Sequence, residues 1–166
     1  MQNDAPEPAD LDALGQLIEG IEVAMLTTRA ADGSLVSRPL QTLELDANGD
    51  LVFFTSVESG KVDELAANPD VNVAYADVDA NRYVSIRGRA RIDRDRATIE
   101  ELWSPAQKAF FPEGRNDPRL AVLRVRVRDA AWWDAAGNFV ERWFDFARAL
   151  LSEEASDLGK HGHIRA

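Results

Sequence analysis

Six short runs rich in apolar, β-branched and aromatic residues predict β-strands, and two of these runs, 83–92 and 123–128, alternate apolar with polar residues at a period of two. The clearest run is 83–92, where Val84 and Ile86 share one face and arginines share the other. The other five predicted strands cover residues 23–28, 35–45, 51–55, 71–76 and 123–127. Turn-forming segments at 31–34 and 46–50 separate the first three strands. Short turns favour antiparallel pairing.

Apolar residues spaced three and four apart predict four helices around these strands. We expect Asp10 to cap the first helix, which ends near Gly20. The second helix follows Ser59, and Asp95 caps the third. The fourth covers about 138–152 and carries an apolar stripe of aromatic and aliphatic side chains.

This order of elements predicts a mainly β (α+β) fold, a six-stranded antiparallel barrel or strongly curled sheet with flanking helices. We expect a flexible tail over residues 1–9, a single domain over 10–153 and a C-terminal tail over 154–166. Pro39 interrupts the second strand. Because proline has no N–H for a ladder, we expect an edge, a bulge or a ligand-facing backbone there.

Composition and charge limit the classes of binding partner and the cellular compartment that we expect for the chain. The chain has 166 residues, of which 45% are hydrophobic, so it is long enough for one domain with a real core. Its net charge of -10 repels nucleic acid and anionic membranes, so neither is expected as a partner. The absence of cysteine excludes disulfides and thiolate metal sites. A polar N-terminus and the lack of long apolar runs predict a cytoplasmic protein.

Two segments carry candidate chemistry. Between a strand and a helix, Ser59, Gly60 and Lys61 combine a hydroxyl, approachable backbone and an ammonium group, which suits a phosphate. The alternative is a capped helix with a solvated lysine. In the second strand, Arg38 beside Pro39 can form a forked contact with a phosphate. Its alternative is an edge strand whose arginine reaches solvent.

The two segments belong to a series of short motifs whose order along the chain resembles that of a known protein family. The chain resembles the pyridoxamine-phosphate-oxidase-like split β-barrels, and more closely their bacterial general stress protein branch, from about residue 23 to residue 134. The motifs that carry it are Met25-Leu26-Thr27-Thr28, Ser37-Arg38-Pro39-Leu40, Phe53-Phe54-Thr55, Ser59-Gly60-Lys61, Asn68-Pro69, Gly88-Arg89-Ala90, Glu101-Leu102-Trp103-Ser104-Pro105, Phe110-Phe111-Pro112-Glu113-Gly114 and Asp117-Pro118.

The resemblance implies flavin mononucleotide (FMN), or alternatively FAD, at the interface of a homodimer. It implies that Arg38 and Lys61 hold the phosphate with help from Ser59. Tyr83 matches the position from which the oxidases send a glutamine across from the second subunit. It implies that Pro39, Leu40, Phe54 and Thr55 line the isoalloxazine ring and that Trp103 and Phe111 wall it, while Ser37 belongs to the same motif as Arg38.

The function that the resemblance implies is flavin binding, with an FMN-dependent oxidoreductase of unknown substrate as its enzymatic form. A non-enzymatic protein that holds or senses flavin is the alternative, and the same fold can hold a deazaflavin or haem. Gly60 stands where the oxidases have an arginine, which removes one phosphate cation. The chain also departs from the C-terminal segment that binds pyridoxamine in the oxidases, so we do not expect vitamin B6 oxidase activity.

Two further groups of residues need an interpretation. His161 and His163 offer a metal or haem ligand pair, but a structural metal site needs three or four ligands. We therefore expect a disordered tail and no metal. The polar faces of two strands carry six arginines, which we interpret as a salt-bridged surface or a dimer contact rather than a substrate site. They are Arg87, Arg89, Arg91, Arg124, Arg126 and Arg128.

Overall fold

The computed structural model describes residues 8–134 and 160–165. Within these ranges the chain forms seven strands, three α-helices and two short 3-10 helices. In chain order they are α1 (Pro8–Ile18), β1 (Val23–Arg29), β2 (Leu35–Leu45), β3 (Asp50–Ser56), α2 (Gly60–Ala67), β4 (Asp70–Asp77), β5 (Arg82–Asp93), α3 (Arg96–Leu102), η1 (Pro105–Ala109), η2 (Gly114–Asn116), β6 (Leu120–Asp134) and β7 (Lys160–Arg165).

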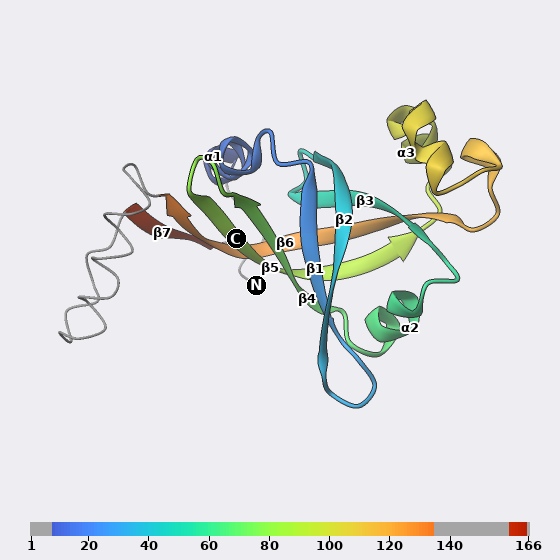
Figure 1. Cartoon of the computed structure of the whole chain (residues 1–166), viewed down its shortest axis with the longest axis horizontal. Helices are drawn as coiled ribbons and strands as arrows, with labels where there is room; N and C mark the ends of the chain where they lie inside the picture. The colour runs from blue at the N-terminus through green and yellow to red at the C-terminus, as the bar shows by residue number, and fades with distance from the viewer. Residues whose placement is uncertain (1–7, 135–159, 166) are drawn as a thin grey trace.

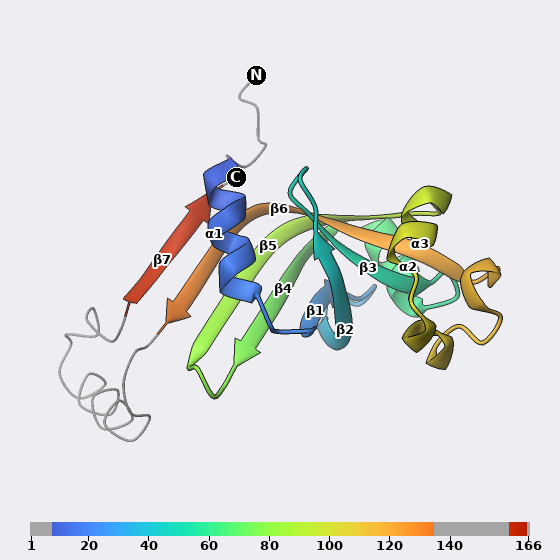
Figure 2. The same cartoon turned by 90° about the horizontal axis from the view of Figure 1, so that it is seen from above.

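The strands form one antiparallel sheet in the order β3-β2-β1-β4-β5-β6-β7. Pairing of β3 with β6 closes the first six strands into a barrel (Figure 1). This confirms the predicted six-stranded antiparallel split barrel with flanking helices. Viewed from above, α1 lies across one end of the strands, whereas α2 and α3 lie toward the other end (Figure 2).

The seventh strand lies where the sequence predicts a tail. β7 pairs with the second half of β6, from Asp129 to Asp134, and extends the sheet beyond the closed ring. Its six residues contain one large apolar side chain and none of the apolar runs that mark the other strands, so its signal is absent from the sequence. β6 is much longer than the run predicted for it, and its free edge provides the ladder. The predicted helix over 138–152 lies outside the described residues.

Inward-facing side chains of five barrel strands form the main core, and Leu40 and Leu45 of β2 pack against it partly buried. α1 buries Leu14 and Ile18 in the same core. This helix begins at Pro8, before the expected cap at Asp10, because a proline fits the first helical turn without losing a hydrogen bond. The strand residues of this core are Ala24, Leu26, Leu51, Phe53, Val71, Val73, Tyr75, Val84, Ile86, Ala90, Leu123, Val125, Val127 and Ala130.

A second, smaller core lies outside the barrel. The outward side chains of β3 and β6, Val52 and Val122, are buried beneath Ile99 of α3 and Phe111. Asp95 caps α3 as predicted, since its carboxylate accepts from the Ala97 backbone N–H. The segment from α3 to η2 therefore covers the outer face of the β3–β6 pair. Among the described helices, none covers the outer face of β1, β4 and β5.

The interruption at Pro39 explains the split in the barrel. Along its first half, β2 pairs only with β1, and Pro39 lies opposite Met25. Pairing with β3 begins at Thr42, and the register shifts between Thr42 and Glu44. Pro39 thus lies on a local edge, where its missing N–H removes no ladder bond. The two strands separate at this point, and the candidate site described below lies in the opening.

Most of the arginines on β5 and β6 are paired with aspartates. Arg91 and Arg126 both reach Asp50, at 2.6 Å each. Arg87 pairs with Asp129, and the other ion pairs join Arg124 to Asp46, Asp93 and Asp95, and Arg128 to Asp70. These contacts support the interpretation of the arginine rows as a salt-bridged surface.

The barrel leaves no room for a side chain at Gly88, so Gly88→Ala is expected to lower the free energy of unfolding by about 2 kcal/mol. A Cβ atom there would lie 2.5 Å from Val125 Cγ1 and 2.7 Å from the Arg126 carbonyl oxygen. Gly15→Ala is the matched control, because a Cβ in this turn of α1 meets nothing within 4 Å. Helix propensity makes that change neutral or stabilising. Chemical denaturation of both variants tests this, and equal stabilities would contradict it.

Candidate functional site

A pocket of about 370 Å³ lies where β2 separates from β3. Its walls are mostly apolar, and one end carries hydroxyls and an ammonium group. The lining residues come from β2, β3, the start of α2, and the segment around η1. They are Pro39, Leu40, Gln41, Leu43, Phe54, Thr55, Ser56, Ser59, Lys61, Gln107, Phe110 and Phe111.

Lys61 organises the polar end of the pocket. It lies in the first turn of α2 on the same buried side as Leu65, and only 8% of its surface is exposed. Its Nζ donates to Thr55 Oγ1 and to Ser59 Oγ, each at 2.9 Å. Ser59 occupies the N-cap position of α2, but its hydroxyl accepts from Lys61 instead of from a helix amide. The alternative interpretation, a helix capped by the Ser59 side chain beside a solvated lysine, is therefore wrong.

The surroundings of Lys61 disfavour its charge. Burial lowers the pKa of Lys61, and the neighbouring guanidinium of Arg38 lowers it further, while Glu64 offsets part of the effect. The two hydroxyls accept two of its three N–H donors. A negative charge beside Lys61 would favour its protonated form, and would therefore raise its pKa against the effects of burial and of Arg38.

Arg38 is held on the other side of this cluster. Its guanidinium donates to Glu64 Oε2 at 2.8 Å, and Thr28 Oγ1 donates to the same oxygen at 2.5 Å. The hydrogen bond from Thr28, together with the hydrogen bond and the charge of Arg38 and the charge of Lys61, lowers the pKa of Glu64 although burial opposes this. Glu64 is therefore a carboxylate, and it pairs with the Arg38 guanidinium. Arg38 itself does not line the pocket.

Aromatic residues form the pocket wall opposite β2. Phe54 and Phe111 line it directly, and Trp103 packs against Phe54 with ring centroids 6.1 Å apart. Trp103 thus supports the wall from behind rather than lining it. Phe110 is 72% exposed at the pocket, an unusual exposure for so large an apolar side chain.

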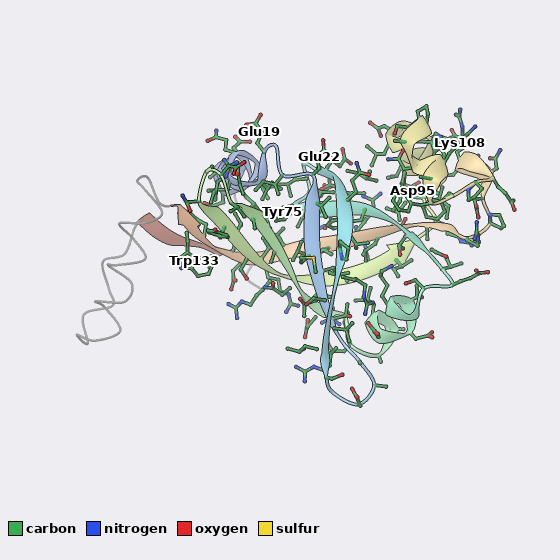
Figure 3. The ribbon with its side chains drawn as sticks, in the orientation of Figure 1. Glu19, Glu22, Tyr75, Asp95, Lys108 and Trp133 are labelled. Atoms are coloured by element: carbon green, nitrogen blue, oxygen red, sulfur yellow. The ribbon has the colours of Figure 1, made fainter. Side chains whose placement is uncertain are left out.

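Two predicted site residues lie away from the pocket. Ser37 is on the outer face of β2, where its hydroxyl bonds to Thr27 Oγ1 at 2.7 Å. Tyr83 is on the outer face of β5, directly opposite Trp133 of β6. Trp133 lies at the opposite end of the molecule from Lys108, which is in η1 beside the pocket (Figure 3). Within one chain, Tyr83 therefore does not reach this pocket.

Five lining residues were missed by the sequence reasoning: Gln41, Leu43, Ser56, Gln107 and Phe110. Gln41 and Leu43 follow the Pro39 motif, and Ser56 follows Thr55, so extending those motifs would have found them. Gln107 and Phe110 belong to η1 and its end. Their place in the pocket depends on how that short segment folds back over β3, which no local periodicity predicts.

The pocket contains little acid–base chemistry. Lys61 is the one titratable side chain among its described lining residues. Within residues 8–134 and 160–165, no three His, Cys, Asp or Glu side chains converge on a metal-sized site. Among the helices of the described residues, none has the length and the apolar run that a bilayer-spanning helix needs. The arrangement is suited to binding an elongated molecule with an anionic end and a planar apolar body.

The chain is similar to known proteins in sequence and, for some of them, in structure. The fungal protein bli-3 of Neurospora crassa is 26% identical over 170 residues, covering 96% of this chain and 81% of bli-3. The general stress FMN/FAD-binding protein of Xanthomonas citri has a solved structure with 27% identity and a TM-score of 0.67, covering 80% of this chain and 94% of that one.

A third protein, general stress protein 26 from Jannaschia, is 23% identical with a TM-score of 0.68, over 95% of this chain and 99% of its own. At that identity it supports the fold alone. A family model described as "pyridoxamine 5'-phosphate oxidase like" matches residues 9–157, which is most of the sequence. The family match includes every strand of the closed barrel and the whole pocket. The chain belongs to the pyridoxamine 5'-phosphate oxidase-like family.

Proposed function

We propose that this protein binds flavin mononucleotide in the pocket between β2 and β3, and that it does so as a homodimer. One observation carries the proposal. A buried lysine, flanked by two hydroxyls and an arginine, forms the polar end of a pocket whose other walls are apolar and aromatic. The name of the Xanthomonas citri relative, an FMN/FAD-binding protein, supports the same ligand class.

The polar end fits a phosphate. Lys61 already donates to Thr55 and Ser59, and it has a third N–H for an anion. Arg38 adds a second positive charge that a phosphate can share with Glu64. A phosphate monoester has more negative charge and more acceptor oxygens than the diester groups of FAD, so FMN is the preferred form. FAD would use the same ring and the same lysine.

The apolar walls fit the ring. Phe54 and Phe111 offer flat apolar surface, and the backbone of Pro39 and Leu40 lies on a local strand edge opposite them. A bound flavin supplies hydride and electron transfer. The protein's residues bind and orient it, and steady oxidation of NADH by the loaded protein would add oxidoreductase activity to this binding function. Loaded protein without turnover would be a flavin-holding or sensing protein.

The homodimer is supported by an outer sheet face that no described helix covers. One row of this face crosses five strands through Pro39, Met25, Ala74, Ser85 and Ala131, which lie opposite one another in turn. It contains no charged residue. Met25 is 42% exposed in the chain, so the row leaves apolar surface in contact with water.

This face is continuous with the pocket, because Pro39 belongs to both. A second copy docked on the face would cover the mouth of the pocket. It could also bring its own Tyr83 to a site that Tyr83 of the same chain does not reach. We therefore place the cofactor between two subunits, with Lys61 from one and Tyr83 from the other. We name the row from Pro39 to Ala131, with the neighbouring Val23, Tyr83 and Trp133, the open face.

Lys61→Met is expected to weaken FMN binding about 20-fold, because a charge-assisted hydrogen bond to phosphate contributes roughly 1.5–3 kcal/mol. Riboflavin has the same ring without the phosphate, so its affinity should stay within about twofold of wild type by the same reasoning. Fluorescence quenching of each flavin on titration with protein measures both affinities.

Lys108→Met is the matched control, since Lys108 is exposed on η1 and does not line the pocket. It should bind both flavins as wild type does. Equal losses of FMN and riboflavin affinity in the Lys61 variant would contradict a phosphate contact. Wild-type protein that binds neither flavin would refute the proposed function as a whole.

A further inference from the structure

Gln107 is a buried polar side chain in the wall of the pocket. It is only 6% exposed, it lies in η1, and it lines the pocket together with Phe110 and Phe111. The family resemblance assigns it no role, and the charge pattern of the sequence does not single it out. A buried amide is stable only when its donors and acceptors find partners, so its hydrogen bonds need to be accounted for.

Ser104 fixes the orientation of this amide. The Ser104 backbone N–H and the Ser104 hydroxyl both bond to Gln107 Oε1, at 2.7 and 2.6 Å. A backbone N–H can only donate, so the atom that faces it must be the carbonyl oxygen of the amide. Rotating the amide by half a turn would set its NH2 group against the Ser104 N–H and lose that bond.

The NH2 group of Gln107 consequently points away from Ser104. None of the residues in the described ranges provides it with an acceptor. The two oriented N–H donors are not among the fully buried polar atoms that lack a partner, so the NH2 group retains some exposed surface on a side chain that lines an otherwise apolar part of the pocket. Such donors favour a ligand with a hydrogen-bond acceptor on the edge of its planar body.

We propose that Gln107 donates a hydrogen bond to a carbonyl or ring-nitrogen acceptor on the edge of the flavin ring, and so determines which rings the pocket accepts. This inference rests on the proposed flavin-binding function. The chain then recognises its ligand with two independent groups: Lys61 at the phosphate and Gln107 at the ring. Because Ser104 holds the amide, Gln107 selects for an acceptor and against a donor at that edge.

Gln107→Glu tests the direction of this hydrogen bond. The variant has nearly the same shape and keeps one oxygen for Ser104, but at pH 8 it presents a carboxylate where the amide presents donors. Riboflavin is the probe, because it lacks the phosphate and does not depend on Lys61. We expect its affinity to fall about tenfold at pH 8, the size of one lost hydrogen bond that leaves a polar group unpaired.

Lowering the pH separates a hydrogen bond from a packing effect. A buried carboxyl protonates at higher pH than an exposed one, and its O–H is then again a donor. At pH 5.5 the Gln107→Glu variant should recover most of its affinity, to within about twofold of wild type at the same pH. Gln107→Leu, which has no donor at any pH, should stay weakened at both.

Gln16→Glu is the control, because Gln16 is an exposed glutamine on α1 outside this pocket. It should follow wild type at both pH values. Wild-type affinity of the Gln107→Glu variant at pH 8 would overturn the inference, and so would a loss that does not recover at pH 5.5. Failure of the wild-type chain to bind any flavin would overturn the proposed function and this inference with it.

Discussion

Ala74→Arg is expected to dissociate the proposed homodimer and to remove flavin binding at the same time. Ala74 is at the centre of the open face, opposite Met25 on one side and Ser85 on the other. In a symmetric interface the substitution appears in both copies, so two guanidinium groups would lose water without gaining a carboxylate. We expect the dissociation constant of the dimer to rise more than about 100-fold, since each buried unpaired charge costs several kcal/mol.

Sedimentation velocity across a range of protein concentrations measures the dimer, and riboflavin titration of the same samples measures the pocket. Ala97→Arg is the matched control. Ala97 is exposed on α3, on the far side of the β3–β6 pair from the open face, so this variant should remain dimeric and bind flavin. A monomeric Ala74→Arg protein with unchanged flavin affinity would show that one chain holds the whole site. A dimeric Ala74→Arg protein would show that the open face is not the dimer interface.

The sequence predicts the barrel well because each strand carries its own signal. In β5, the alternation of Val84 and Ile86 with arginines determines which side faces the core, and the structure buries both. β7 was missed for the opposite reason. Its residues, from Lys160 to Arg165, have no apolar alternation, and they become a strand only because β6 presents a free edge. A strand that has its own apolar pattern can be predicted from the local sequence. A strand that forms only by pairing with a distant edge can be found only once the sheet has been assembled.

The candidate site likewise has a part that the sequence predicts and a part that it does not. The residues in and beside short motifs, such as Pro39 and Lys61, line the pocket where the motif order suggests. The actual environment of each was not predictable. Lys61 is buried between two hydroxyls rather than solvated, and Arg38 is engaged by Glu64, which lies 26 residues further along the chain. These contacts depend on α2 packing against β1, a tertiary arrangement that no window of the sequence describes.

The arginine rows illustrate how far charge counting can mislead. On the sequence, six arginines on neighbouring strands suggest a basic surface on an acidic protein. In the fold, Asp50 is 1% exposed between Arg91 and Arg126, and other aspartates pair with Arg87, Arg124 and Arg128. A carboxylate this deeply buried is retained only with partners. Removing the carboxylate therefore has a larger consequence than removing any one of the arginines.

Asp50→Ala is expected to lower the free energy of unfolding by about 3 kcal/mol at pH 7, at the lower end of the range for breaking a buried pair because both arginines are partly exposed. Side-chain exposures of 49% for Arg91 and 38% for Arg126 allow water to solvate the guanidinium groups that lose their partner. Asp50→Asn keeps the shape and one acceptor oxygen, so its loss should be smaller. Asp79→Ala, in the exposed turn before β5, is the control and should change stability by less than about 0.5 kcal/mol.

The pH dependence of the Asp50 variants provides the sharper test. Burial alone would raise the pKa of Asp50, but the hydrogen bonds and charges of Arg91 and Arg126 outweigh it and lower the pKa below its ordinary value of 3.8. A group whose pKa is lowered by folding adds stability above its unfolded-state pKa and loses it as the pH falls through the folded value. The stability difference between wild type and Asp50→Asn should therefore be full at pH 7 and shrink once the pH drops below 3.8. Urea unfolding at several pH values measures it, and a difference that stays constant into acid would mean that Asp50 acts through its shape rather than its charge.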